Sequence, residues 1–143
     1  MKRYVRLIGI PFIIAVCIFL FIKFVWLKEF KFMPITIDQY VELYNSNDEG
    51  IIYVSDNKFD KTAEFEATIK NVFQNKKVTV YMLNLTDISD LEHQKFVEIS
   101  KFPDNSFIVP MILYIKDGVI MDSIEGYALE DKVKEFVEKN NIE

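Results

Sequence analysis

The sequence contains few of the residues that small proteins use for cross-links, metal sites and phosphate loops. It has one cysteine, one histidine, four glycines and four prolines in 143 residues. A single cysteine excludes an intramolecular disulfide and a zinc site built from several cysteines. Glycine-rich phosphate loops, a Gly-x-Ser-x-Gly nucleophile elbow and the spacing of a calcium loop are also missing. We therefore expect no metal, no cofactor and no catalytic residue of these types.

The charged residues that are present are unevenly distributed. Half of the residues are apolar and 27% are charged, which is typical of a folded chain of single-domain size. The net charge is −5, yet residues 1–31 hold six basic side chains and one acidic side chain. The remaining 11 basic and 21 acidic side chains give residues 32–143 a net charge of −10. Such an acidic body would repel a phosphate backbone, so we expect no nucleic-acid partner.

The amino-terminal segment has the composition of a membrane-spanning helix. Sixteen uncharged residues lie between Arg6 and Lys23, and the apolar character continues to Leu27. A helix over Leu7–Leu27 is long enough to cross a hydrocarbon core of about 30 Å, and the Lys23 amine can extend to the interface. The sequence thus predicts a cytoplasmic tail at 1–6, a transmembrane helix at 7–27 and a tether at 28–35.

Processing and orientation of this segment follow from its flanks. No small-residue cleavage pattern follows the apolar stretch, which favours an uncleaved signal anchor. Cys17 does not match a lipoprotein signal, because Val16 precedes it and the residues after it stay apolar. Basic residues flank both sides, and the free amino terminus and Glu29 slightly favour an amino terminus inside the cell. We expect a single-pass protein of the cell membrane with an extracytoplasmic acidic domain.

Residues 36–143 predict an α/β domain. Thr36 and Gln39 offer capping chemistry for the first helix, and Asp60 or Thr62 could cap the second. Asp117-Gly118 between two apolar runs is typical of a β-hairpin. After a first helix ending before residue 45, apolar periodicity predicts a strand at 51–54, a helix at about 60–75, a strand at 77–85, a helix at 91–102, strands at 107–115 and 119–124, and a helix at 128–140. The order α-β-α-β-α-β-β-α combines a parallel β-α-β unit and an antiparallel hairpin in one mixed sheet.

The second half of this domain resembles the thioredoxin-like superfamily. Val109-Pro110 is followed by an apolar strand, Lys116-Asp117-Gly118, a second strand, Gly126 and an amphipathic helix. This is similar to the family's succession of a cis-proline, a strand, a hairpin turn, a strand, a glycine and a last helix. The resemblance covers roughly residues 36–140, and it implies a mixed central sheet with flanking helices and a cis peptide bond before Pro110. The membrane-anchored layout is similar to that of bacteriocin transport accessory-type proteins.

The same resemblance shows where the family's redox chemistry is missing. In redox-active relatives the strand that corresponds to 51–54 leads into a Cys-x-x-Cys motif, and Phe59-Asp60-Lys61-Thr62 stands in its place. The buried acid of many thioredoxins corresponds to Tyr53. Thiol–disulfide exchange requires a thiolate, so no catalytic residue of the family carries over. We favour a protein that is not an enzyme, and a degenerate oxidoreductase that borrows a partner's thiol stays open as an alternative.

A peptide-binding groove beside the proline is what the resemblance does carry over. In the family an extended peptide pairs with the main chain of the residue before the cis-proline. On this sequence the groove would be formed by Phe59, Asp60, Lys61, Thr62, Val109, Pro110 and Tyr127. Phe59 and Tyr127 would supply apolar anchors for the partner. The alternative is that Pro110 only shapes a turn and Phe59 packs against the start of a helix.

Together these observations predict a bacterial, membrane-anchored thioredoxin-like domain without a redox dithiol. Its expected role is to bind a protein or peptide partner in secretion or in envelope-protein maturation. A bacteriocin accessory or immunity-type protein, whose membrane helix carries the specificity, is a further alternative. His93 is interpreted as a residue on a helix surface rather than as a ligand or a base.

Overall fold

The computed structural model describes residues 30–102 and 106–143. The predicted cytoplasmic tail and the predicted transmembrane helix lie outside these ranges. Within them, no helix has both the length and the apolar composition needed to cross a membrane. Lys31–Glu143 forms one structural unit. Its elements are β1 (Met33–Ile35), α2 (Ile37–Asn45), β2 (Glu49–Ser55), α3 (Thr62–Phe73), β3 (Val80–Asn84), α4 (Asp90–Ser100), β4 (Met111–Lys116), β5 (Val119–Glu125) and α5 (Glu130–Lys139).

The first strand is the one element that the sequence did not predict. Met33–Ile35 pairs in parallel with β3, so three residues of the predicted tether belong to the sheet. A three-residue run that contains Pro34 carries almost no strand signal of its own. Pro34 is tolerated because β1 is an edge strand with a neighbour on one side only. Proline lacks an N–H group, and on an edge strand there is no second neighbour to which that group would donate. From α2 onward, the order of helices and strands agrees with the prediction.

The five strands form one mixed sheet in the order β1-β3-β2-β4-β5. β1 and β2 run parallel to β3, whereas β4 is antiparallel to β2 and to β5. These directions bring Ser55, Asn84, Met111 and Glu125 to the same end of the sheet. We call this the cis-proline end, because the Val109–Pro110 peptide bond is cis, as the resemblance implied. The other end holds the starts of the three parallel strands and the β4–β5 turn.

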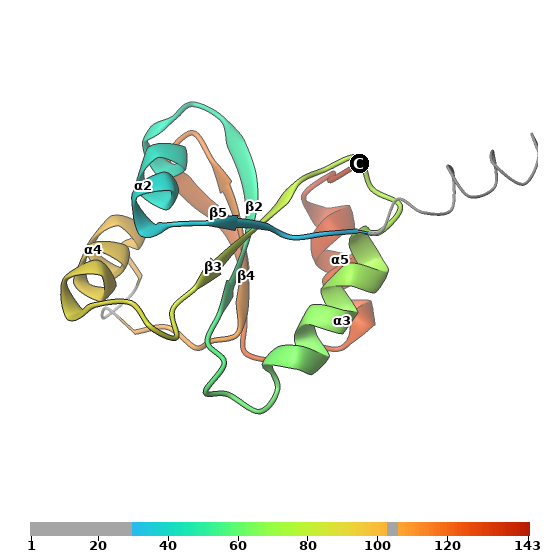
Figure 1. The fold of residues 1–143 in the computed structure, drawn as a ribbon. Coiled ribbons are helices and arrows are strands. Elements are labelled where there is room, and N and C mark those ends of the chain that lie inside the picture. Colours follow the sequence, from blue (N-terminus) through green and yellow to red (C-terminus); the bar gives the residue numbers. More distant parts are fainter. Residues whose placement is uncertain (1–29, 103–105) are drawn as a thin grey trace, which may run out of the picture. The chain divides into compact units, whose positions relative to one another are not determined.

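Two pairs of helices cover the two faces of the sheet (Figure 1). The helices α2 and α4 contact each other on one face, and α3 and α5 contact each other on the other. On the first face the buried Tyr40 hydroxyl lies 2.7 Å from the Ser100 hydroxyl oxygen. Burial raises the pKa of Tyr40, so this phenol stays neutral at physiological pH. On the second face Phe65 and Phe136 are almost completely buried.

The helix starts were predicted correctly in one case and wrongly in another. Thr36 caps α2 in a capping box with Gln39, as its sequence indicated. At α3 neither Asp60 nor Thr62 is the cap, because Lys61 occupies that position without a side-chain hydrogen bond. Thr62 is already helical, and its hydroxyl donates to the Asp56 carbonyl oxygen at 2.8 Å. This bond joins the start of the helix to the loop before it, in place of a cap.

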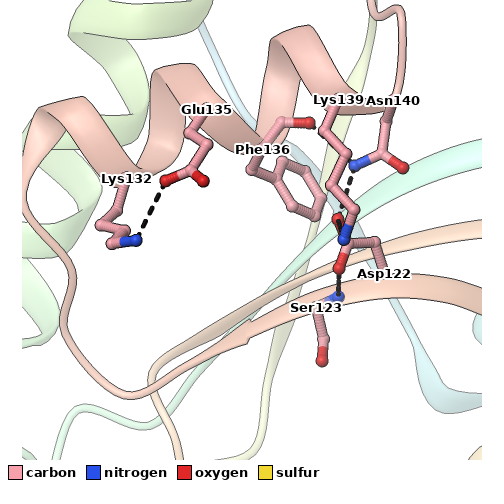
Figure 2. A network of polar contacts seen from close by, with 7 residues as sticks. All are labelled: Asp122, Ser123, Lys132, Glu135, Phe136, Lys139 and Asn140. Carbon is pink, nitrogen blue, oxygen red and sulfur yellow. Dashed lines mark hydrogen bonds and ion pairs between the residues drawn. The ribbon is translucent and has the colours of Figure 1, made fainter.

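A polar network attaches α5 to the last strand (Figure 2). The Asp122 carboxylate accepts hydrogen bonds from Lys139 Nζ at 3.0 Å, from Asn140 Nδ2 at 2.9 Å and from the Ser123 N–H at 3.0 Å. Burial opposes ionisation of this carboxyl, but the three donors outweigh it and lower the pKa of Asp122. Asn140 Nδ2 also donates to the Phe136 carbonyl oxygen at 2.8 Å, which ties the network to the end of the helix.

Candidate functional site

Hydrogen bonds to Asp56 stabilise the loop between β2 and α3. The Asp56 carbonyl oxygen accepts from the Phe59 N–H at 3.1 Å and from the Thr62 hydroxyl. The Asp56 carboxylate accepts from the Lys58 N–H at 2.9 Å. These bonds fix a tight turn that leaves the Phe59 side chain 49% exposed. The loop therefore presents a large apolar ring to solvent on a fixed backbone.

Behind this loop lies a buried tyrosine. The Tyr53 hydroxyl donates to the Thr62 carbonyl oxygen at 3.2 Å, and its ring packs edge-on against Phe65 with centroids 5.9 Å apart. The Phe32 ring lies 5.2 Å from the same ring. Burial and the charge of Glu66 raise the pKa of Tyr53, so the group is neutral at physiological pH. The position that corresponds to the buried acid of many thioredoxins thus supports the loop by packing and one hydrogen bond.

The segment before the cis-proline leaves one pair of main-chain groups unused. The Ile108 N–H donates to Glu125 Oε2 at 3.1 Å, and the Ile108 carbonyl accepts from the Gly126 N–H at 3.2 Å. Val109 lies in a bend two residues before Met111, the first residue of β4 that pairs with β2. Among the described residues, neither the N–H nor the carbonyl of Val109 has a hydrogen-bond partner.

A cavity of about 520 Å³ opens beside this segment, and we call it the cis-proline groove. It lies between the β2–α3 loop, the start of α4 and the segment before β4. Apolar and polar residues both line it. The apolar lining consists of Phe59, Leu85, Ile88, Phe107, Ile108 and Val109, and the polar lining consists of Asp56, Lys58, Thr86, Asp90 and His93. Within 30–102 and 106–143, no three acidic, histidine or cysteine side chains are grouped to hold a metal ion.

The predicted site residues fall into two groups in the structure. Phe59 and Val109 line the cis-proline groove, and Pro110 follows directly in the chain. Asp60 is exposed in the loop, and Thr62 is buried behind it. Thr62 therefore offers no side chain to a partner, and its role is to hold the loop.

The other two predicted residues, Lys61 and Tyr127, contact each other outside the groove. Lys61 Nζ lies 5.6 Å from the centroid of the Tyr127 ring and pairs with Glu64 at 2.7 Å. The hydrogen bond from this amine to Glu64 raises the pKa of Lys61. The Tyr127 ring packs edge-on against Phe65 at 6.2 Å. Tyr127 is still 39% exposed, so it borders the cis-proline end without lining the groove.

Sequence reasoning missed the contribution of α4 to this site. The His93 ring stacks at 34° on Phe107, with centroids 5.8 Å apart, and both residues line the groove. Phe107 packs further on Phe96 at 5.3 Å and on Phe102 at 5.2 Å, which fixes the segment before the cis-proline. His93 does lie on a helix surface, as predicted, but that surface borders the groove. A sequence signal for this contribution was available. α4 is the element that follows β3, so its start had to lie at the end of the sheet where β2 also ends.

A larger cavity of about 600 Å³ lies at the other end of the sheet. Three of its polar side chains, Glu49, Tyr114 and Lys116, pair with one another. The Tyr114 hydroxyl donates to Glu49 Oε2 at 2.9 Å, and Lys116 Nζ lies 3.4 Å from the same oxygen. The cis-proline groove, in contrast, is bordered by the unpaired main chain of Val109, which an extended ligand can satisfy. We therefore regard the cis-proline groove as the candidate site.

Comparison with solved structures shows a thioredoxin-like fold. Thioredoxin from Aeropyrum pernix is 16% identical and covers 74% of this chain and 84% of its own, with a TM-score of 0.57. Mitochondrial thioredoxin 3 from Saccharomyces cerevisiae is 13% identical, with coverages of 76% and 94% and a TM-score of 0.54. A putative oxidoreductase with a thioredoxin fold is 13% identical, with coverages of 72% and 92% and a TM-score of 0.56. No family model matches the sequence. The predicted α/β thioredoxin-like fold is thus confirmed.

Proposed function

We propose that this protein is a membrane-anchored, extracytoplasmic thioredoxin-like domain that binds an extended segment of a partner protein. It has no thiol–disulfide activity of its own and acts as an accessory module in secretion or envelope-protein maturation. The observation that carries the proposal is the unpaired main chain of Val109 beside an apolar groove. An extended partner satisfies these two groups and fills the groove with its side chains.

The geometry favours a partner in β-conformation. The pairing of β2 with β4 ends at Val54 and Met111, just after the unpaired main chain of Val109, so an added segment would take the place of a continuing β2 strand. Each main-chain hydrogen bond formed there contributes about 0.5–1.5 kcal/mol net. The exposed Phe59 ring and the groove beneath it then supply apolar contacts, which in strand addition determine the side chains that are accepted.

The residues at the motif positions favour binding without redox catalysis. Phe59 and Thr62 stand where redox-active relatives have cysteines, and neither side chain forms a mixed disulfide. The Thr62 hydroxyl is moreover engaged with the Asp56 carbonyl. The one thiol of the chain, Cys17, lies in the predicted membrane segment.

The first strand begins at the end of the sheet away from the groove. β1 runs parallel to β3, so Met33 lies at the end of the sheet opposite Val109. In the proposed arrangement Leu7–Leu27 anchors the protein in the membrane, and the groove binds segments of secreted or envelope proteins.

Peptide selection with the full chain tests this proposal. The protein is held in uncharged detergent, and a displayed library of random dodecapeptides is selected after depletion on empty micelles. We expect enriched peptides whose binding slows hydrogen exchange at the Val109 amide, followed by NMR. Phe59→Ala is expected to weaken them about tenfold because it removes an apolar anchor. Met121→Ala, which truncates a similarly exposed apolar side chain on β5, serves as the control. Unchanged exchange at Val109 in the bound state would overturn the proposal.

An insulin-reduction assay separates binding from the oxidoreductase alternative. With dithiothreitol as the electron source, the full chain is expected to reduce insulin no faster than dithiothreitol alone. The Cys17→Ala variant should behave identically, since it removes the one thiol. Turnover clearly above the background, without an added thiol protein, would contradict a non-catalytic role.

A further inference from the structure

Exposed apolar side chains are concentrated at the cis-proline end. Eight large apolar side chains of the described residues are exposed. Three of them, Met33, Val119 and Met121, lie on strands. The other five lie in the loops and helix starts of the cis-proline end, and they are Phe59, Leu91, Ile108, Tyr127 and Leu129. This end thus carries five of the eight exposed large apolar side chains of the described residues, and it also contains the groove.

The same end is strongly acidic. The loops of this end that lead to α3, α4, β4 and α5, with the first turns of these helices, are residues 56–64, 85–92, 106–110 and 125–131, and they contain nine acidic and two basic side chains. The segments at the opposite end, residues 30–33, 45–49, 74–79, 116–119 and 138–143, contain five of each sign. The charge of the domain is therefore polarised along the strands, with the excess of acid around the apolar surface.

Helix capping accounts for only part of this acidity. Five of the nine acids lie in the first turns of α3, α4 and α5, where the helix dipole stabilises negative charge. The other four, Asp56, Asp60, Asp87 and Glu125, lie outside the helices. Among the described residues, none of these four forms an ion pair. Their charge is not required by the helices and is not neutralised within the domain.

We propose that the segment bound in the cis-proline groove is cationic, with lysine or arginine flanking an apolar centre. This inference rests on the proposed function and specifies its partner. The lining of the groove itself contains two acidic side chains, Asp56 and Asp90, and one lysine, Lys58. Complementary charge accelerates encounter and discriminates against wrong partners. The same charges repel acidic segments and anionic lipid surfaces, so a basic protein segment is the matching occupant.

The charge of selected peptides tests this inference separately from the proposed function. Dodecapeptides enriched on the full chain are sequenced, and their mean net charge is compared with that of the input library. We expect a clear positive shift, and affinities that weaken as ionic strength rises because exposed charges are screened. Enriched peptides with the charge of the input would overturn the inference and leave the proposed function intact. Absence of any enrichment would overturn both.

A matched pair of double variants assigns the effect to the acidic rim. Asp60→Asn with Asp87→Asn removes two charges beside the groove from carboxylates outside its lining. Asp48→Asn with Asp117→Asn removes the same charge at the opposite end. At low ionic strength the first pair is expected to weaken an enriched basic peptide about fivefold and a neutral peptide hardly at all. The second pair should change neither affinity. Equal effects of the two pairs, or equal effects on both peptides, would overturn the inference.

Discussion

The two ends of the sheet use their polar groups in different ways. At the opposite end Glu49, Tyr114 and Lys116 satisfy one another across the larger cavity. At the cis-proline end the main chain of Val109 has no partner among the described residues, although the cavity beside it is smaller. On this comparison we base the proposed binding site on unused hydrogen-bonding groups and not on cavity size. Polar groups without a hydrogen-bond partner are the better indicator of a binding site, because it is costly to bury a polar group that forms no hydrogen bond.

The largest expected effect comes from the ring that supports the cis-proline end. Phe65 is fully buried between Tyr53 and Tyr127. Phe65→Ala should lower the free energy of unfolding by about 3–5 kcal/mol, because it leaves a cavity behind the loop. Urea unfolding followed by circular dichroism measures the loss. The exposed Phe59, changed to Ala, should cost less than about 1 kcal/mol. Equal losses for the two variants would show that Phe59 is packed as a core residue.

A smaller effect is expected for the hydrogen bond behind the loop. Tyr53→Phe removes the hydroxyl that donates to the Thr62 carbonyl oxygen and keeps the ring. We expect a loss of about 1 kcal/mol in unfolding free energy, the usual net value of one hydrogen bond. Hydrogen exchange at the Phe59 amide should accelerate as the loop loosens. A variant as stable as the parent would show that the ring alone supports this end.

The network around Asp122 predicts a dependence on pH. Because the pKa of Asp122 is lowered in the folded state, its contribution is complete above the ordinary value of 3.8 and is lost as the pH falls through the lower folded value. Asp122→Asn should therefore destabilise by about 1 kcal/mol at neutral pH, and the difference from the parent should shrink below about pH 4. Thermal unfolding across this pH range measures it. A difference that stays constant with pH would exclude the charge of Asp122 as its cause.

The smallest effect is expected at the opposite end. The Lys116–Glu49 pair is exposed, with about half of each side chain or more in solvent. Lys116→Ala should change the unfolding free energy by less than about 0.5 kcal/mol, because solvent screens such pairs. Peptide affinity, measured by fluorescence anisotropy, should stay unchanged. A loss of affinity would place the binding site at the larger cavity and invert the comparison between the two ends.

The features that could be predicted from the sequence are those encoded by neighbouring residues. Asp117-Gly118 predicted the hairpin turn, where both residues have positive φ angles of 52° and 69°. A side chain at Gly118 would also meet the Tyr44 carbonyl oxygen at 2.8 Å, so glycine is required there. The order of elements from α2 onward also followed from local patterns, and the cis bond before Pro110 was implied by the family resemblance.

The missed features depend on segments far apart in the chain. β1 forms because β3 offers an edge with which it can pair, and a run of three residues carries no sequence signal of such a pairing. The groove combines residues from the β2–α3 loop, α4 and the segment before β4. Which side of α4 borders the groove, and hence the placement of His93, is decided by how the helix packs. The pairing of Lys61 with Tyr127 outside the groove is likewise a consequence of tertiary packing.

The first strand also determines where the folded unit can be cut. A fragment that began at residue 36 would lack β1 and the Phe32 ring that packs against Tyr53. β3 would then become an edge strand with unpaired main-chain groups, which promote intermolecular strand pairing and aggregation. The three residues of β1 therefore protect the edge of β3 from pairing with another chain. Expression fragments that keep residues 31–35 are therefore expected to aggregate less than fragments that begin at residue 36.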